Sequence, residues 1–312
     1  MRVEIITNPE QLPDIASDNI FKSRQWFELF SGEQSTCVVA FVVYDGSKLV
    51  MLQSVMIQDF IKFLPRCLGS YCVVWGEPFC IEDIAEADVK QAFELLILAI
   101  EKYAKRKVLF VEYRHFSDEN IYMCNFAAHK YKAIKWGNII QNIAPQSDVI
   151  SLFNQSKRRQ VRKALSNGVE LSTTPTSDEW RDYYLILKQL YKKINRPLPS
   201  FSVFERLRSS SIGVCCVVKN SGKVIAGISM LYDAECGGYE WYISGMNREY
   251  PHLYPSTMAL YVALKHIADN GGGRFNYMGA GQLDKPYSVR DHKLTFGGDL
   301  ATEYRYRKYL LI

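Results

Sequence analysis

Five basic residues lie within seven positions of the sequence, between Lys157 and Lys163, and no acidic residue interrupts them. At the helical period of 3.6 residues, Arg158 and Arg162 share a face, and Arg159 and Lys163 lie beside them. Clustered like charges repel one another until an anion bridges them, and guanidinium groups match the geometry of phosphate. The segment therefore predicts an anion-binding site, and the alternative is a solvated helix face.

A second group of polar residues lies between Gly279 and Gly298, after a predicted strand. A glycine-bounded loop with several hydrogen-bond donors is a common place for a binding or catalytic site. His292 is the side chain that titrates near neutral pH, although a lone histidine is often structural. Lys293 offers a cation that could stabilise a developing oxyanion. The further candidate substrate contacts are Tyr254, Tyr287 and Arg290.

Chemistry on an amine also needs a group that accepts the proton of the attacking ammonium. Glu240 lies in a predicted strand over 238–244 and is a carboxylate that could do so, and the alternative is an exposed strand carboxylate. Tyrosines and basic residues alternate over 303–309, which fits either a stacking platform for nucleic acid or a two-faced final strand.

No metal site is predicted, because the eight cysteines form no C-x-x-C pair and no Cys/His spacing typical of zinc.

The composition is that of a globular protein: 312 residues, 48% hydrophobic and 23% charged, enough for two domains with sizeable cores. The 38 Lys+Arg against 33 Asp+Glu leave a net charge of +5, and the segment 157–163 alone holds five basic residues. This localised charge argues against a generally basic nucleic-acid coat. No signal peptide and no apolar run of about 18 residues is found, so we expect a cytoplasmic protein without a membrane span.

Both halves of the chain repeat one order of elements: helix, β-hairpin, strand, helix, strand. The first half has a helix over 19–30, a hairpin over 36–57, a strand over 71–75, a helix over 84–104 and a strand over 108–113. The second half has helices over 154–166 and 178–194, strands over 213–219, 223–232 and 238–244, a helix over 255–269, and strands over 274–278 and 302–310. The order predicts a duplicated α+β unit with domains 1–150 and 151–312.

This order, together with four local motifs, resembles the acyltransferases of the GNAT superfamily, and in particular the tandem-GNAT FemABX and BioF2-like group. The basic helix 156–164 followed by Asn167-Gly168-Val169 is similar to that group's R-x-x-I-R-K-A-x-x-x-G-V. The other three motifs are Pro255-Ser256, Gly272-Gly273-Arg274-Phe275-Asn276 and His292-Lys293-Leu294-Thr295-Phe296-Gly297-Gly298. The resemblance covers nearly the whole chain. It implies two GNAT-like domains, each with a mixed, mostly antiparallel sheet flanked by helices.

The same resemblance implies an acyl- or aminoacyltransferase, in which an acceptor amine attacks an activated acyl donor and an amide forms. The second domain would carry the reaction, and the acceptor would lie between the domains. Lys293 would stabilise the tetrahedral intermediate, and Glu240 occupies a position similar to that of the base in several simple GNAT enzymes. The implied donor is acyl-CoA or aminoacyl-tRNA, with no tightly bound cofactor. The implied acceptor is a phosphorylated or otherwise anionic small molecule, and tRNA is a further potential partner.

Three positions depart from the family pattern. The segment 247–254 lacks the R/Q-x-x-G-x-G/A loop that cradles the CoA pyrophosphate, and Pro255 has no backbone N–H, which points away from acetyl-CoA. Asn276 stands in place of an acid and His292 in place of a phenylalanine, which leaves the catalytic details open. The alternative function is a non-catalytic GNAT-fold module that binds a phosphorylated ligand or RNA through the helix 157–163.

Overall fold

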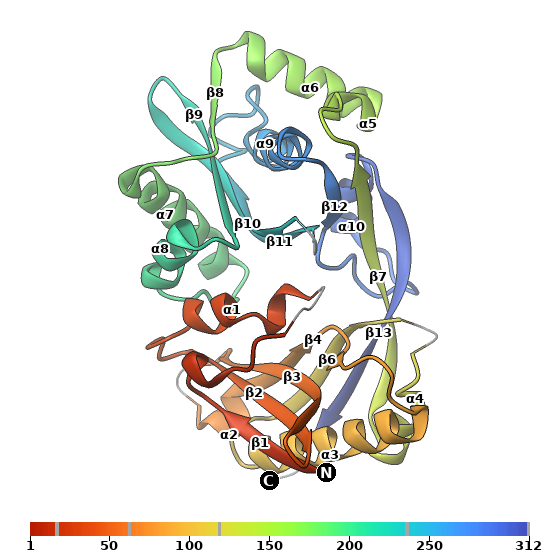
Figure 1. Ribbon diagram of the computed structural model, residues 1–312. Helices are drawn as coiled ribbons and strands as arrows, with labels where there is room; N and C mark the ends of the chain where they lie inside the picture. Colours follow the sequence, from red (N-terminus) through yellow and green to blue (C-terminus); the bar gives the residue numbers. More distant parts are fainter. Residues whose placement is uncertain (16–18, 62–63, 118–119, 235–236, 311–312) are drawn as a thin grey trace. The chain divides into compact units, whose positions relative to one another are not determined.

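The computed structural model in Figure 1 describes residues 1–15, 19–61, 64–117, 120–234 and 237–310. The chain divides into two compact units, of which unit 1 comprises Met1–Trp136 with Thr302–Ile312, and unit 2 comprises Gly137–Ala301. The predicted boundary between residues 150 and 151 differs from this division. Strand β7 (Lys132–Ile143) runs from one unit into the other, and the C-terminal strand β13 (Asp299–Tyr309) returns to pair with β6 (Phe110–Phe116) of unit 1.

Unit 1 is built on a sheet in the order β1-β2-β3-β4-β6-β13. Its further strands are β1 (Arg2–Ile6), β2 (Thr36–Asp45), β3 (Lys48–Asp59), β4 (Ser70–Trp75) and β5 (Phe79–Cys80), which pairs with β3. Neighbours are antiparallel except β4 and β6, which run parallel. The predicted hairpin 36–57 is thus confirmed as β2 and β3.

The helices of unit 1 lie on both faces of its sheet, with α1 and α3 on opposite sides (Figure 1). They are α1 (Arg24–Leu29), α2 (Arg66–Gly69), α3 (Glu86–Ala104) and α4 (Met123–Ala128), with 3-10 turns at Pro9–Gln11 and Ile20–Lys22. Alternate residues of β2 pack against the apolar side of α3, because successive strand residues point to opposite faces.

Unit 2 is built on a sheet in the order β7-β12-β11-β10-β9-β8. Its strands are β8 (Val169–Ser172), β9 (Gly213–Asn220), β10 (Lys223–Asp233), β11 (Gly237–Gly245) and β12 (Gly273–Asn276). Only the β11–β12 pair among those described is parallel. Both units therefore have a mixed, mostly antiparallel sheet with helices, as predicted.

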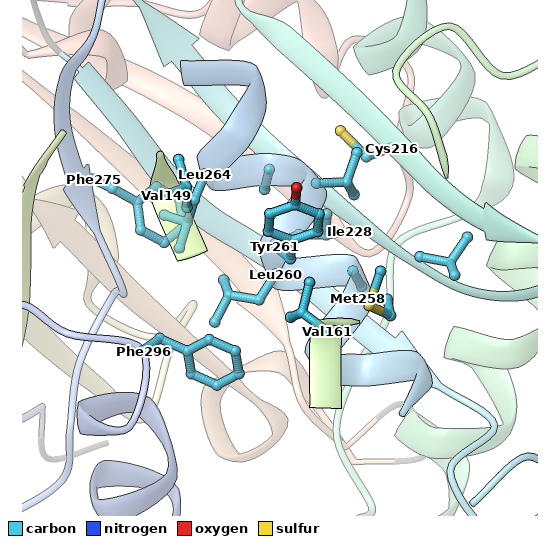
Figure 2. Close-up of a cluster of buried hydrophobic side chains, with 14 of the residues drawn as sticks. Val149, Val161, Cys216, Ile228, Met258, Leu260, Tyr261, Leu264, Phe275 and Phe296 are labelled. Atoms are coloured by element: carbon cyan, nitrogen blue, oxygen red, sulfur yellow. The ribbon is translucent and has the colours of Figure 1, made fainter. Parts of the chain in front are cut away.

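The helices of unit 2 are α5 (Val149–Leu152), α6 (Gln155–Ser166), α7 (Ser177–Lys193), α8 (Phe201–Ser209), α9 (Pro255–Asp269) and α10 (Ser288–Leu294). Figure 2 shows the core around α9, where Met258, Tyr261 and Leu264 lie among side chains from the sheet, from α6 and from Phe296. The predicted loop 279–298 is partly wrong, because it contains α10. Within the described chain, no helix combines the length and apolarity needed to cross a bilayer.

Candidate functional site

Helix α6 turns one of its five cations inward. Asn154 caps the helix by accepting a hydrogen bond from the Lys157 backbone N–H. The buried residues of the helix are Lys157, Val161 and Ala164, which share one face because they are spaced by four and three positions. Val161 packs into the core of unit 2 (Figure 2). The same face therefore carries Lys157 into the interior, where it is 9% exposed.

The ammonium of Lys157 meets only neutral acceptors. Nζ donates to Gln160 Oε1 at 3.1 Å and to Thr257 Oγ1 at 3.2 Å, and lies 5.0 Å from the centre of the Phe296 ring. No acidic residue of the described chain forms an ion pair with it. Burial lowers the pKa of Lys157, since a charged ammonium loses hydration there. A buried cation without a counter-charge is costly to a fold and is common at functional sites.

Lys157 lines a cavity of about 340 Å³ that lies within unit 2. The lining residues are Lys157, Gln160, Asn247, Pro251, Tyr254, Ser256, Thr257 and His292. They come from α6, from the β11–α9 connection and the start of α9, and from α10. Three predicted site residues, Lys157, Tyr254 and His292, are thus brought together from distant parts of the sequence.

His292 contributes an imidazole to this cavity. The residue as a whole is exposed, but the loss of hydration on the cavity side, and then the positive charges of Lys157 and Lys293, lower the pKa of His292 to about 4. The ring is therefore neutral at pH 7, with one nitrogen able to accept a proton. Its ring centre lies 5.3 Å from that of Phe296, which also underlies the Lys157 ammonium. The cavity thus holds a cation and a neutral proton acceptor.

Lys293, the next residue, points elsewhere. Its Nζ lies 2.9 Å from Glu240 Oε1 and donates to the backbone carbonyls of Tyr277 and Gly279. Both side chains of the ion pair are 11% exposed. The structure therefore brings the two predicted catalytic residues Lys293 and Glu240 together, but with their charges directed at each other and not at the cavity.

The N-terminus of α9 borders the cavity and is largely closed to a ligand. Tyr254 adopts a left-handed conformation with φ of 50°, and Pro255 follows at the first helical position, where it supplies no N–H. The Ser256 N–H donates to Asn247 Oδ1 at 3.1 Å, and Asn247 Nδ2 donates to Ser256 Oγ at 2.7 Å. Pro255 therefore has no N–H to offer, and the Ser256 N–H is already bound to Asn247. A pyrophosphate at this helix would need such N–H groups.

The other predicted contacts are placed differently. Arg158 Nε donates to the Phe153 carbonyl at 2.6 Å, and Arg159, Arg162 and Lys163 are exposed on the outer side of α6. The Arg290 guanidinium donates to the carbonyls of Gln282 at 3.0 Å and of Lys285 at 2.8 Å. Arg290 therefore holds the loop before α10, and this contact accounts for its position without a substrate. The Tyr287 ring is 40% exposed and packs against Gly281.

Sequence reasoning missed the neutral residues of the cavity, above all Gln160, Thr257 and Asn247. It also grouped Lys157 with the exposed cations of its helix. One signal could have separated them: Lys157 lies four residues before Val161 and seven before Ala164, the apolar stripe of an otherwise polar helix. No signal in the sequence shows that Asn247 binds Ser256 in the first turn of α9, because that contact joins the start of the β11–α9 connection to a residue nine positions later.

Comparison with solved structures identifies the fold. No protein-family model matches the chain, and no curated protein matches its sequence. The chain is similar to FemX at a TM-score of 0.67, with 13% identity over 99% of this chain and 98% of that one. It is similar to a tandem GNAT protein from the clavulanic acid biosynthesis pathway at a TM-score of 0.54, with 10% identity over 100% and 99% of the two chains.

A third similar structure is L-PGS from Bacillus licheniformis, at a TM-score of 0.54 and 12% identity over 89% of each chain. Identities this low show the fold alone. The fold is that of a FemX-like pair of GNAT domains, and the resemblance drawn from the sequence motifs is confirmed at this level.

Proposed function

We propose that this chain, with its tandem GNAT fold, is an N-acyltransferase whose reaction takes place in the unit 2 cavity. An acceptor amine attacks the carbonyl carbon of an ester or thioester, and an amide forms as the ester or thioester bond breaks. The observation that carries the proposal is the convergence of Lys157 and His292 from α6 and α10 on one cavity. A cation and a neutral base are the two groups that such a reaction uses.

The Lys293–Glu240 ion pair does not line the cavity, but it helps to position a residue that does. Lys293 spans from α10 to β11 through Glu240 and to the segment after β12 through the Tyr277 carbonyl. The pair thereby fixes α10, and with it the neighbouring His292. A direct role for Lys293 at the acyl carbonyl stays a prediction, and the ion pair supports a positioning role for it.

For the donor, we propose an activated acyl group that is not delivered by a pyrophosphate at the start of α9. The support is the closed N-terminus of that helix, where Pro255 lacks an N–H and Asn247 occupies the next one. Aminoacyl-tRNA or an acyl group on a carrier protein fits this arrangement better than acetyl-CoA. For the acceptor we propose an anionic molecule, attracted toward unit 2 by the exposed cations Arg159, Arg162 and Lys163 of α6.

The test is a transfer assay with hydroxylamine as a small amine acceptor, because any activated acyl donor then gives a hydroxamate. The donors are acetyl-CoA, palmitoyl-CoA, an acyl-carrier-protein thioester and a mixture of aminoacyl-tRNAs. We expect hydroxamate above the uncatalysed rate with one of the last two. No product from any donor would contradict the proposed function. A rise in thermal midpoint with free CoA and acetyl-CoA would overturn the donor assignment.

A second candidate function is non-catalytic binding of a phosphorylated ligand or RNA through α6. It is favoured by the exposure of Arg158, Arg159 and Arg162 on one helix, with no acidic partner in an ion pair within the described ranges. In that case binding of a labelled RNA would fall steeply with salt and with Arg159→Gln or Arg162→Gln. His292→Gln would have no effect on it.

A further inference from the structure

The residue in the cavity that most needs an explanation is Lys157. The other four cations of its segment are exposed, whereas Lys157 is 9% exposed and, within the part of the chain that the structure describes, donates to neutral groups. Thr257 Oγ1 also donates to Gln160 Oε1 at 3.1 Å, so these two residues can satisfy each other without the lysine. The fold therefore does not require an ammonium at this position.

The hydrogen-bond count leaves a donor for a ligand. A lysine ammonium has three N–H donors. Two of them are directed at Gln160 and Thr257, which hold Nζ in place from α6 and α9. The third has no hydrogen-bond acceptor within the described chain, and because Lys157 also lines the cavity, a ligand bound there can accept it. A fixed donor in a partly dehydrated site is the arrangement that stabilises negative charge on a carbonyl oxygen.

Resting on the proposed function, we propose that Lys157 is the catalytic residue that binds the acyl carbonyl oxygen, in place of Lys293. The lone pair of the acceptor amine forms the new C–N bond, and the carbonyl π electrons move to the oxygen, where Lys157 Nζ stabilises the oxyanion. His292 takes the proton that the amine nitrogen loses. When the oxyanion collapses, the bond to the leaving oxygen or sulfur breaks, and His292 returns the proton to it.

The two residues are coupled by charge. Before reaction, Lys157 opposes protonation of His292, and the positive charge of Lys293 acts in the same direction. An oxyanion on Lys157 neutralises that opposition, so the imidazole becomes more basic at the step in which it must accept a proton. The other charged groups on or against this helix, within the described chain, are Asp291 beside His292, Arg290, whose guanidinium donates to the Gln282 and Lys285 carbonyls, and the pair Lys293–Glu240. Lys293 is already compensated by Glu240, which leaves Lys157 as the cation that responds to the substrate.

The experiment measures hydroxamate formation by the full chain with Lys157→Gln, using the donor that the wild type accepts. We expect kcat to fall roughly 100- to 1000-fold with KM changed little, because the contact forms in the transition state. Lys157→Arg should recover part of this loss. The matched control is Lys188→Gln, an exposed lysine of α7, which we expect to behave as the wild type.

A double variant separates catalysis from structure. If Lys157 and His292 act as a unit, Lys157→Gln with His292→Gln should lose no more activity than the worse single variant. Losses that multiply, or wild-type kcat in Lys157→Gln, would overturn this inference while the proposed function stands. A wild-type protein that forms no hydroxamate from any donor would instead refute the proposed function, and this inference with it. Thermal unfolding of each variant checks that the fold is intact.

Discussion

The two units of this protein each bury a charge, and they compensate it in opposite ways. In unit 1, Glu112 is 0% exposed and is surrounded by three arginines. Arg114 Nε lies 2.5 Å from Oε1, Arg307 contacts Oε2, and Arg305 Nη1 lies 3.5 Å from Oε1. In unit 2, Lys157 is buried against an amide, a hydroxyl and an aromatic ring.

The contrast supports the proposed division between a structural charge in unit 1 and a functional charge in unit 2. Every oxygen of Glu112 is used within the fold, and aromatic rings lie against the arginines: Trp136 is 3.7 Å from Arg305 and Phe110 is 4.9 Å from Arg307. The arginines of unit 1 therefore compensate the negative charge of the buried Glu112. No carboxylate in the described part of unit 2 compensates the positive charge of Lys157 in this way, and a substrate oxyanion would do so. Substitutions at the two sites should thus change stability with opposite signs.

The largest effect is expected for Glu112→Ala. It leaves three guanidinium groups close together without a carboxylate, so we expect the free energy of unfolding to fall by about 3–5 kcal/mol. Urea unfolding followed by circular dichroism measures this. The control is Glu86→Gln, which removes an exposed carboxylate from an ion pair with Lys90 and should leave the midpoint unchanged. A loss at Glu112 no larger than at Glu86 would refute the assignment of Glu112 as a structural centre.

The same carboxylate should also affect how the free energy of unfolding changes with pH in the acid range. Burial alone would raise the pKa of Glu112, but Arg114, Arg305 and Arg307 outweigh it and lower the pKa below 4.5. A lowered folded-state pKa adds stability above pH 4.5, and this part is lost as the pH falls through the folded value. Glu112→Gln should therefore flatten the decline in stability below pH 4.5.

A smaller loss is expected at the Lys293–Glu240 pair. Glu240→Ala leaves the Lys293 ammonium with backbone carbonyls only, and we expect about 2 kcal/mol of destabilisation. If the pair acts through position, the double change Glu240→Leu with Lys293→Met should regain most of that stability. It should not regain transferase activity, because α10 loses its tie to β11. Additive losses in stability would argue that the two residues act independently.

The sequence predicted the elements of this protein better than its site. Periodicity located the hairpin of β2 and β3 and the helix α9, because their apolar patterns are long and regular. Helix α10 was missed, since seven residues between glycine-rich segments carry too short a pattern. The alternation of Tyr304, Arg305, Tyr306 and Arg307 is confirmed as a two-faced strand, with Tyr306 stacked on Phe126 and both arginines on Glu112.

The different surroundings of Lys157 and Lys293 could not be predicted from the sequence, for a physical reason. Motifs record residue types, whereas the roles of Lys157 and Lys293 depend on which of them meets a carboxylate. Lys293 lies 53 positions from Glu240, and nothing local in either segment reports their ion pair. Only the spacing of Lys157 from Val161 and Ala164 contained usable information, because helical geometry then fixes the direction of the side chain.

A gain in stability is expected for Lys157→Met. Methionine fills a similar volume without a charge to dehydrate, and Thr257 still donates to Gln160. We expect the free energy of unfolding to rise by about 1 kcal/mol, together with the loss of transferase activity. This is the reverse of the Glu112 result. Urea unfolding in parallel with Lys188→Met measures it, and destabilisation by Lys157→Met would indicate that the lysine serves the fold.

The smallest effect is expected at His292. Lys157→Gln removes one charge that opposes protonation, while burial, the larger cause, remains, so the pKa should rise from about 4 part of the way toward 6.5. Because the folded-state pKa is lowered, the neutral ring adds stability above pH 6.5 that is lost as the pH falls to 4. Lys157→Gln should therefore lose less stability than the wild type between pH 6.5 and pH 4. NMR titration of the ring, assigned with His292→Asn, measures the shift, and Lys188→Gln should show none. An unchanged pKa in Lys157→Gln would mean that the two side chains do not share the cavity.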